Sequence, residues 1–439
     1  MFSKKIIVLL LVLLFTAIGI STATALEPIE QLGKSIFFDQ NLSINKNQAC
    51  AACHGPDVGF TGPDSMINAH GAVYEGSVPN RFGNRKPPSA AYAGDSPILY
   101  YDSTANMWVG GMFWDGRATG WTLDDPLAEQ AKGPFLNPLE QAIPDKACVV
   151  YRVCTATTYP VSFQTVSAGA CDIMWPNNVD GVCRKKNGMV NLSPDDRIKV
   201  EENYNNIAKS IAAYERSAEV NTFSSKYDDY LTGGALTEQQ ALGLALFNGN
   251  AMCNLCHTSD LVDSKPPLFT DFTYDNLGLP KNPENPFYSE PLFNPLCTNW
   301  IDFGLGGFLV TIPDLNKYAY DNYGKFKVPT LRNVARGSCE AGYSPCIIKA
   351  YGHNGYFKSL KRIVHFYNTR NTLPVCEPTK KEPLTDKVAE MKGCWPLPEL
   401  ALNMNMTELG DLGLTSEEED AIVAFLMTLS DGYMPPSTP

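Results

Sequence analysis

The chain has 439 residues, of which 44% are hydrophobic and 19% are charged, a composition typical of folded globular proteins. Its 47 acidic residues outnumber the 35 basic residues, and the formal net charge is −12. This excess of negative charge argues against binding to the phosphate backbone of nucleic acids, and we expect no nucleic-acid partner.

The amino terminus has the pattern of a secretory signal. Lys4 and Lys5 precede an apolar run over residues 6–18, and residues 23–25 read A-T-A, which is typical of a cleavage site. We predict that residues 1–25 are removed and that the mature protein is periplasmic, with an extracellular or cell-surface location, or an uncleaved anchor, as alternatives. No later segment approaches the ~20 apolar residues of a membrane helix, so we expect no membrane span after cleavage.

Two pentapeptides, at residues 50–54 and 253–257, both read C-x-x-C-H. This is the attachment signature of c-type haem, in which two thiols bond to the haem and the adjacent histidine binds its iron. A zinc site or a disulfide across each C-x-x-C would leave the repeated histidine unexplained. We therefore predict two covalently bound haem c groups, attached through Cys50, Cys53, Cys253 and Cys256, with His54 and His257 as iron ligands.

An internal repeat precedes the two motifs. The pattern L-G-x-x-[I/L]-F occurs at residues 32–37 and again at residues 242–247, with the spacing of one helix face. Residues 237–240 read T-x-x-Q and residues 415–418 read T-x-x-E, which is the spacing of a helix capping box. We expect a mainly α protein made of two cytochrome c-type haem domains with long loops.

The predicted domains cover residues 26–232 and 233–439, with the boundary at the sequence T-G-G of residues 232–234. Residues 144–193 lack helical periodicity and are predicted to be an inserted loop held by two disulfides, with three pairings open. Since nine cysteines lie outside the haem motifs, one of them is expected to be a free thiol. They are Cys148, Cys154, Cys171 and Cys183 in the insertion, and Cys297, Cys339, Cys346, Cys376 and Cys394 beyond it.

Five further segments carry distinctive sequences. They are F-W-D-G-R-A at residues 113–118, E-Q-A-K-G-P at 129–134, N-P-L-E at 137–140, F-K-V-P-T-L-R-N at 326–333 and G-H-N-G at 352–355. With the two haem motifs in this order, the chain resembles the bacterial dihaem cytochrome c peroxidases and their relative MauG. The resemblance covers nearly all of the mature chain outside the insertion. It implies that hydrogen peroxide binds at the first haem and that the second haem relays electrons.

The resemblance also assigns residues to the peroxide site. Glu140 is similar to the family's acid/base residue, and a carboxylate in this place can move a proton between the peroxide oxygens. Gln130 and Pro134 are similar to a hydrogen-bond donor and a steric wall of the same pocket. Trp114 is similar to the residue through which electrons pass between the haems. The alternatives are a solvated loop glutamate and a core tryptophan.

Three histidines remain outside the haem motifs, His70, His353 and His365. His70 lies 16 residues after His54, where the resemblance implies a removable ligand of the first haem; the alternative is a loop histidine with ordinary titration. His353 is similar to a structural histidine near the second haem. His365 is expected to cap or pack on its helix rather than bind iron, because it is two residues from Tyr367 and adjacent turns of a helix align residues three or four apart.

The sixth ligand of the second haem is where the chain departs from electron-transferring peroxidases. They carry methionine 14 residues beyond the histidine equivalent to His353, whereas this chain has Tyr367, as the resemblance to MauG implies. A phenolate is a hard anionic ligand that stabilises higher oxidation states of iron, whereas a thioether raises the potential. If the local register differs, the ligand would be one of Met391, Met404 and Met406.

Calcium and the reaction partners complete the expectations. The family binds calcium through an asparagine, where this chain has Lys86; an ammonium group cannot bind a cation, so calcium is doubtful and Lys86 is expected to neutralise haem propionates. The expected substrates are hydrogen peroxide and a protein whose tryptophan or tyrosine is oxidised. One alternative is a detoxifying peroxidase that receives electrons from a small cytochrome or cupredoxin. The other is a dihaem electron carrier without catalytic activity.

Overall fold

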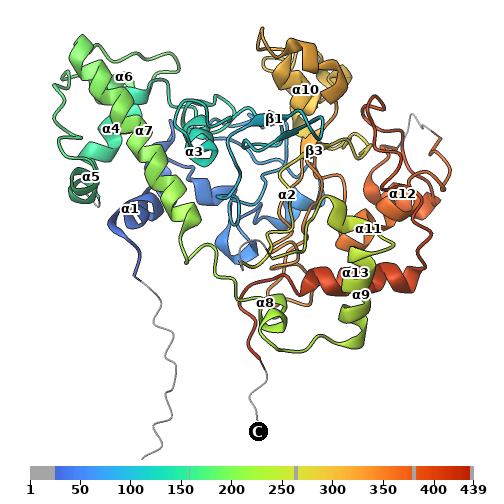
Figure 1. The fold of residues 1–439 in the computed structure, drawn as a ribbon. Coiled ribbons are helices and arrows are strands. Elements are labelled where there is room, and N and C mark those ends of the chain that lie inside the picture. The colour runs from blue at the N-terminus through green and yellow to red at the C-terminus, as the bar shows by residue number, and fades with distance from the viewer. Residues whose placement is uncertain (1–24, 158, 262–264, 378–381, 436–439) are drawn as a thin grey trace, which may run out of the picture.

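The computed structural model describes residues 25–157, 159–261, 265–377 and 382–435. It is mainly α-helical, as predicted, with two groups of helices on either side of a loop-rich centre (Figure 1). Residues 1–24, which hold most of the predicted signal peptide, lie outside the described residues. Within the described ranges, no helix is long and apolar enough to cross a membrane.

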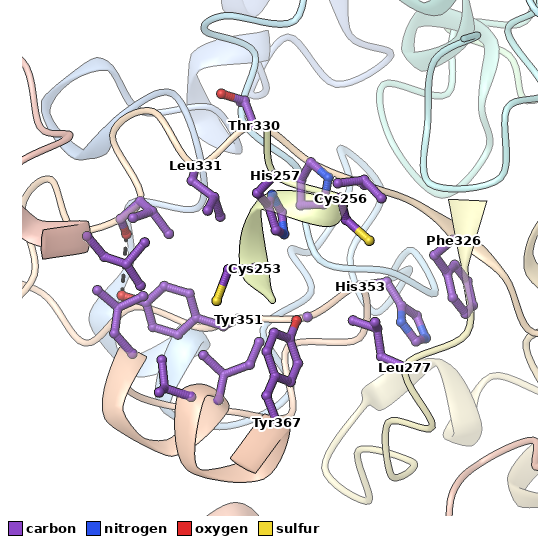
Figure 2. Close-up of a pocket in the computed structure, with 18 of the residues that line it drawn as sticks. Cys253, Cys256, His257, Leu277, Phe326, Thr330, Leu331, Tyr351, His353 and Tyr367 are labelled. Carbon is purple, nitrogen blue, oxygen red and sulfur yellow. Dashed lines mark hydrogen bonds between the residues drawn. The ribbon is translucent and has the colours of Figure 1, made fainter. Parts of the chain in front are cut away.

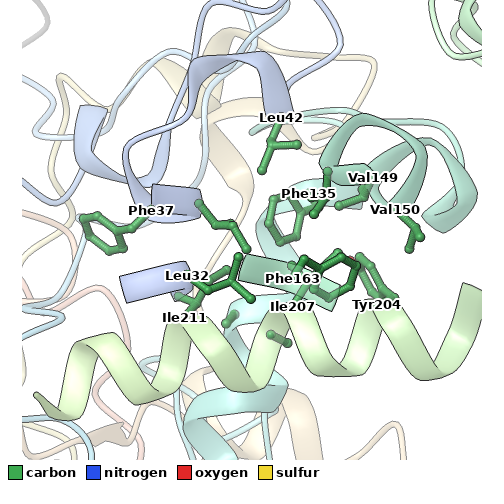
Figure 3. Close-up of a cluster of buried hydrophobic side chains, with 14 of the residues drawn as sticks. Leu32, Phe37, Leu42, Phe135, Val149, Val150, Phe163, Tyr204, Ile207 and Ile211 are labelled. Carbon is green, nitrogen blue, oxygen red and sulfur yellow. The ribbon is translucent and has the colours of Figure 1, made fainter. Parts of the chain in front are cut away.

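The first helical group is built around α7 (Pro194–Arg216), against which α1 (Pro28–Phe37), α3 (Pro126–Leu136) and α4 (Lys146–Thr155) pack. Ser193 caps α7 and is followed by Pro194, a residue that fits the first helical position. Apolar side chains from all four helices meet in one core, shown in Figure 3, which includes Leu32, Phe37, Phe135, Val149, Val150, Tyr204, Ile207 and Ile211.

The predicted insertion is helical, which corrects the expectation of an irregular loop. It contains α4, α5 (Pro160–Val166) and α6 (Val179–Val182). Five residues of α4 face the core, and four of them, Ala147 to Val150, are consecutive, so the sequence shows no one-sided helical period. Two disulfides hold the insertion, as predicted, and their pairing is Cys148 with Cys183 and Cys154 with Cys171.

The second helical group has its own core. It contains α8 (Lys226–Leu231), α9 (Glu238–Asn248), α11 (Leu360–Thr369), α12 (Asp386–Lys392) and α13 (Ser416–Met427). Both predicted capping boxes are present, one at the start of α9 and one at the start of α13. The predicted domain boundary falls in the turn between α8 and α9, although Tyr227 of α8 already packs in the second core.

The repeated Leu-Gly pair places the same helix crossing in both groups. A Cβ atom on Gly33 would lie 1.8 Å from the carbonyl oxygen of Ser210 in α7, and one on Gly243 would lie 1.9 Å from that of Ala421 in α13. Only glycine allows the backbones to approach this closely. The crossings of α1 with α7 and of α9 with α13 therefore correspond, with Ser210 equivalent to Ala421.

Short elements fill the centre of the molecule. The strands β1 (Tyr100–Asp102) and β2 (Met107–Val109) form one antiparallel pair, and β3 (Tyr274–Asp275) and β4 (Phe326–Lys327) form another. The short helix α10 (Gly304–Leu309) contacts β4, and another short helix, α2 (Ser65–Ala69), also belongs to this central region. The structure also contains short 3-10 helices, at Gln40–Leu42, Cys50–Ala52, Pro56–Val58, Cys253–Leu255, Pro286–Ser289, Cys297–Asn299, Asn316–Tyr318 and Tyr320–Asn322.

The cysteines of the second half form two local disulfides. Cys339 pairs with Cys346, and Cys376 pairs with Cys394. Outside the haem motifs, Cys297 is the cysteine that remains unpaired. The prediction of one free thiol is confirmed.

Candidate active site

The first C-x-x-C-H motif folds into a tight turn that positions its histidine. The N–H of His54 donates to the carbonyl oxygen of Cys50 (3.0 Å), and its Nδ1 lies 3.1 Å from the carbonyl oxygen of Phe60. Burial lowers the pKa of His54 to about 4, so the imidazole is neutral at pH 7. With Nδ1 donating to Phe60, the Nε2 lone pair is free to bind iron.

The residues predicted for the peroxide site lie in the same cavity as this motif. Asp125 caps α3, and Gln130 and Pro134 are four residues apart on one face of that helix. Both line the cavity, together with Glu140 from the loop that follows. Burial raises the pKa of Glu140, and the charge of Arg117 and a hydrogen bond from Asn137 oppose this rise. The structure therefore brings the predicted residues together.

Arg117 is a cavity residue to which the sequence reasoning gave no role. Its guanidinium bonds to Asp115 (2.8 Å) and lies over the ring of Phe113, 3.9 Å from the ring centre. The signal was present, because Arg117 belongs to the segment F-W-D-G-R-A. It is the cation whose charge acts on Glu140.

The second motif forms a matching cavity (Figure 2). The Nδ1 of His257 lies 2.8 Å from the carbonyl oxygen of Phe269, and burial lowers the pKa of His257 to about 4. Tyr367 of α11 enters this cavity from the side opposite His257. Burial raises the pKa of Tyr367 above its usual range, so its phenol stays protonated unless a cation binds the oxygen.

The methionines proposed as alternatives to Tyr367 do not line this cavity. Met391 is 68% exposed and Met406 is 58% exposed. Met404 packs against the backbone at Gly278 instead. Tyr367 is thus the candidate ligand that the structure places at the second haem, and its bond to iron remains a prediction.

His353 and His365 occupy positions that agree with their expected structural roles. His353 is buried, lines the second cavity and stacks on Phe326, with 3.5 Å between ring centres. The Nδ1 of His365 lies 2.9 Å from Oε1 of Glu419 on α13. His365 therefore joins two helices and does not face the cavity.

His70 lies outside the first cavity. Its side chain is 60% exposed, and its Nδ1 lies 2.9 Å from Oε1 of Glu284. The residue caps the carboxyl end of α2, and neither it nor α2 lines the cavity that His54 lines. This position does not support His70 as a ligand of the first haem and agrees with the alternative, a surface loop histidine.

The two cavities share a wall. Trp114 and Lys86 line both of them. The indole N–H of Trp114 donates to the carbonyl oxygen of Lys86 (2.8 Å), and the N–H of Lys86 donates to the carbonyl oxygen of His353 (2.8 Å). The rings of Trp114 and His353 meet edge to face, with 6.4 Å between their centres. Trp114 therefore lies between the cavities, and its role in electron transfer remains a prediction.

Buried lysines around the second cavity fit the negatively charged propionates of a haem. Lys86, Lys327 and Lys349 are buried around the second cavity, and among the described residues none has a carboxylate within ion-pair distance. Burial lowers the pKa of both Lys86 and Lys327 to about 8. Each haem carries two propionate carboxylates, which would compensate these charges. The buried Nε2 of His353, which also lacks a partner in the described chain, adds an unsatisfied donor or acceptor at the same wall.

Lys86 also bears on calcium. Its ammonium group donates to Oγ1 of Thr61 (2.9 Å) and to the carbonyl oxygen of Pro87 (3.0 Å). Such oxygens are the ligands that calcium would use, and here a side-chain cation already takes them. Calcium at this position therefore stays doubtful.

Comparison with known proteins agrees with this geometry. Residues 27–235 match the family described as di-haem cytochrome c peroxidase. The methylamine utilization protein MauG of Paracoccus denitrificans is 32% identical over 408 residues, covering 92% of this chain and 89% of that protein. The cytochrome-c peroxidase IdrP2 of Denitromonas iodatirespirans is 26% identical, with coverage of 91% and 81%.

A solved structure gives the same result. The crystal structure of the diheme peroxidase BthA from Burkholderia thailandensis superposes with a TM-score of 0.67 and 27% identity, covering 93% of this chain and 87% of that one. Sequence and fold thus agree over most of the chain, and the family implies two c-type haems and a peroxidase-type oxidoreductase activity. The chain belongs to the dihaem cytochrome c peroxidase family that includes MauG.

Proposed function

We propose that this protein is an exported dihaem oxidoreductase that reduces hydrogen peroxide in the first cavity with electrons delivered through the second. We further propose that these electrons come from tryptophan or tyrosine side chains of a partner protein, as in MauG-type chemistry. The observation that carries this proposal is the position of Tyr367 in the second cavity, opposite His257.

In the first cavity, each side chain has a separate role in the reaction with peroxide. A bound haem, attached through Cys50 and Cys53, would supply the iron that binds peroxide and accepts oxidising equivalents. Glu140 takes a proton from one peroxide oxygen and returns it to the other. The amide of Gln130, which lines the cavity, donates a hydrogen bond to the peroxide, and Pro134, which has no N–H, narrows the cavity without adding a donor.

In the second cavity, the sixth ligand of the iron sets how readily the haem is reduced, and so which electron source fits it. Tyr367 offers an oxygen that becomes anionic when a cation binds it, and such a ligand disfavours the reduced state of iron. A protein built to store an electron from a small cytochrome would gain from methionine here. The methionines proposed as alternative ligands do not line the cavity, and Met252, which does, directly precedes the attachment cysteine Cys253. This arrangement favours oxidation of a partner over simple electron storage.

Trp114 supplies the connection that this scheme requires. It lines both cavities, and its indole is the most easily oxidised ring in the shared wall. Oxidising equivalents formed on the peroxide side can thus reach the second cavity without a dissociating carrier.

The positions of individual residues argue against the two alternative functions, a detoxifying peroxidase and a non-catalytic electron carrier. A detoxifying peroxidase with a removable ligand had its support in His70, whose exposed side chain pairs with Glu284. A non-catalytic electron carrier has no use for Glu140, Gln130 and Pro134 around an open first cavity. Detection of oxidised tryptophan or tyrosine in a co-purifying protein after peroxide treatment would separate partner oxidation from detoxification.

Stopped-flow mixing of the holoprotein with peroxide tests the catalytic part. Glu140→Gln keeps the side-chain shape and removes the acid/base group, so we expect the rate of the spectral change to fall by about 10²–10⁴-fold while haem content is unchanged. Glu201→Gln is the control, because Glu201 is an exposed carboxylate paired with Lys146. A Glu140→Gln protein that reacts as fast as the parent would contradict this role, and a parent that does not react at all would favour the electron carrier.

A further inference from the structure

The two helix crossings allow the cavities to be compared position by position. Because Ser210 in α7 is equivalent to Ala421 in α13, the residue five positions further along each helix is also equivalent. That residue is Glu215 in α7 and Leu426 in α13. Each lines the haem cavity of its own half. The same structural position thus carries a carboxyl group in the first cavity and an aliphatic group in the second.

Glu215 has no neighbour that would hold it as a carboxylate. Glu215 is only 4% exposed, and its Oε2 has no hydrogen-bond partner within the described chain. The adjacent Arg216 is committed to Asp125, with two N–H to oxygen contacts of 2.8 and 2.7 Å. Burial raises the pKa of Glu215 to about 8. A carboxyl group in this environment is protonated at pH 7.

Glu140 in the same cavity has a different environment. The positive charge of Arg117 and a hydrogen bond from Asn137 favour its ionised form. The cation near Glu215, Arg216, is instead paired with Asp125, and Oε2 of Glu215 accepts no hydrogen bond in the described chain. When two carboxyl groups of one site are held in opposite protonation states, one is suited to accept a proton and the other to donate one.

Other ionisable groups around Glu215 do not change this assignment. The charge of Arg216 lowers the pKa of Glu215, and the charge of Asp125 raises it. α1 contributes the apolar Phe37 to the cavity wall and α3 contributes the neutral Gln130. The remaining ionisable groups of the cavity are Cys50, Cys53, His54, Tyr74, Arg85, Lys86, Arg117 and Glu140.

We infer that Glu215 is a proton donor of the first cavity, with a role separate from that of Glu140. This inference rests on the proposed function, since reduction of one peroxide to two waters consumes two electrons and two protons. Glu140 returns the proton that it takes, so it supplies none of these. For each of the two protons, the O–H bond of Glu215 breaks, the proton passes to the peroxide-derived oxygen that becomes water, and the carboxylate regains a proton from solvent before the next transfer. The electrons come from the partner through the second cavity.

The test compares two rates in the holoprotein. The first is the initial reaction with peroxide, and the second is the return of the peroxide-treated protein to its resting spectrum when a reductant such as ascorbate is added. Glu215→Gln should slow the return relative to the first reaction by about 10²-fold, the lower end of general-acid catalysis. Glu140→Gln should change the ratio in the opposite direction. Glu215→Leu, which copies Leu426, repeats the test with a side chain known to fit this position in the other half.

Infrared spectroscopy gives a readout that is independent of turnover. The parent at pH 7 should show the carbonyl stretch of a protonated carboxylic acid that is absent from Glu215→Gln and titrates near pH 8. The return rate of the parent should fall above that pH, because the donor is then ionised, and Glu215→Gln should lack this alkaline fall. Glu219→Gln, which removes an exposed carboxylate paired with Lys34, should match the parent in both measurements.

Three outcomes are decisive. An unchanged ratio of rates in both Glu215 variants would overturn the inference, and so would an acid carbonyl band that persists in Glu215→Gln. A parent that shows the band but does not react with peroxide would instead refute the proposed function, and the two failures are thereby distinguished.

Discussion

Replacing Trp114 by phenylalanine tests the link between the cavities. The substitution keeps an aromatic ring in the shared wall but removes the indole N–H that donates to the carbonyl oxygen of Lys86 at 2.8 Å. Among the described residues, that oxygen accepts no other hydrogen bond. Leaving it unpaired should cost about 1–3 kcal/mol of unfolding free energy.

The expected loss of stability is too small to prevent folding. For domains of about 150–250 residues, each kcal/mol lowers the melting temperature by about 2–4 °C. Trp121→Phe is a matched control, because its indole also donates to a carbonyl oxygen at 2.8 Å, that of Leu99, while its ring lies outside both cavities. Because Trp121 is 45% exposed, water can partly replace its lost hydrogen bond. Trp121→Phe should therefore lose no more stability than Trp114→Phe, and the two variants should differ in function.

Rapid-freeze Mössbauer spectroscopy after mixing with peroxide measures that difference. In the parent and in Trp121→Phe, we expect the ferric signals of both haems to disappear together. In Trp114→Phe the first haem should still react while the second stays ferric, and oxidation of a partner should stop. Simultaneous loss of both signals in Trp114→Phe would show that Trp114 is only a packing residue and that electrons take another path.

Two further predictions concern the second haem and the insertion. Tyr367→Met should raise the potential of the second haem and introduce a thioether absorption band in the near infrared; magnetic circular dichroism that already shows methionine in the parent would refute tyrosine ligation. Replacing Cys148 and Cys183 together by alanine opens a loop with a sequence separation of 35, and should lower the unfolding free energy by about 3.8 kcal/mol in the chain-entropy treatment. The shorter Cys339–Cys346 loop, with a separation of 7, should lose only about 2.5 kcal/mol by the same relation when opened, as urea titrations can show.

The parts of the fold that the sequence predicts correctly are those set by local signals. A capping box places hydrogen-bonding groups three residues apart, so the starts of α9 and α13 could be read directly. The Leu-Gly repeat likewise marked both crossing helices, because the close backbone approach at Gly33 and Gly243 requires the missing side chain. The haem motifs and the segment around Glu140 were equally visible in the sequence.

Features set by distant contacts could not be read in this way. His70 has the spacing of a ligand, and only the path of α2 and the contact with Glu284, more than 200 residues away, place it on the surface. Glu215 lies in a stretch that reads as an ordinary helix end. Its importance follows from the cavity it lines and from its equivalence to Leu426, and both require the three-dimensional arrangement.

The wall formed by Trp114 and Lys86 has a consequence for electrochemistry. Trp114 and Lys86 border both haem cavities, as do Pro88 and Ser89, and the backbone at Lys86 is hydrogen-bonded to Trp114 and to His353. In a buried region of low dielectric constant, a change of charge in one cavity acts strongly on the other. The two midpoint potentials of the holoprotein should therefore be properties of the coupled pair, as are the apparent pKa values of interacting acids. Neither haem should then have a fixed potential of its own, since the oxidation state of each sets the driving force for the other.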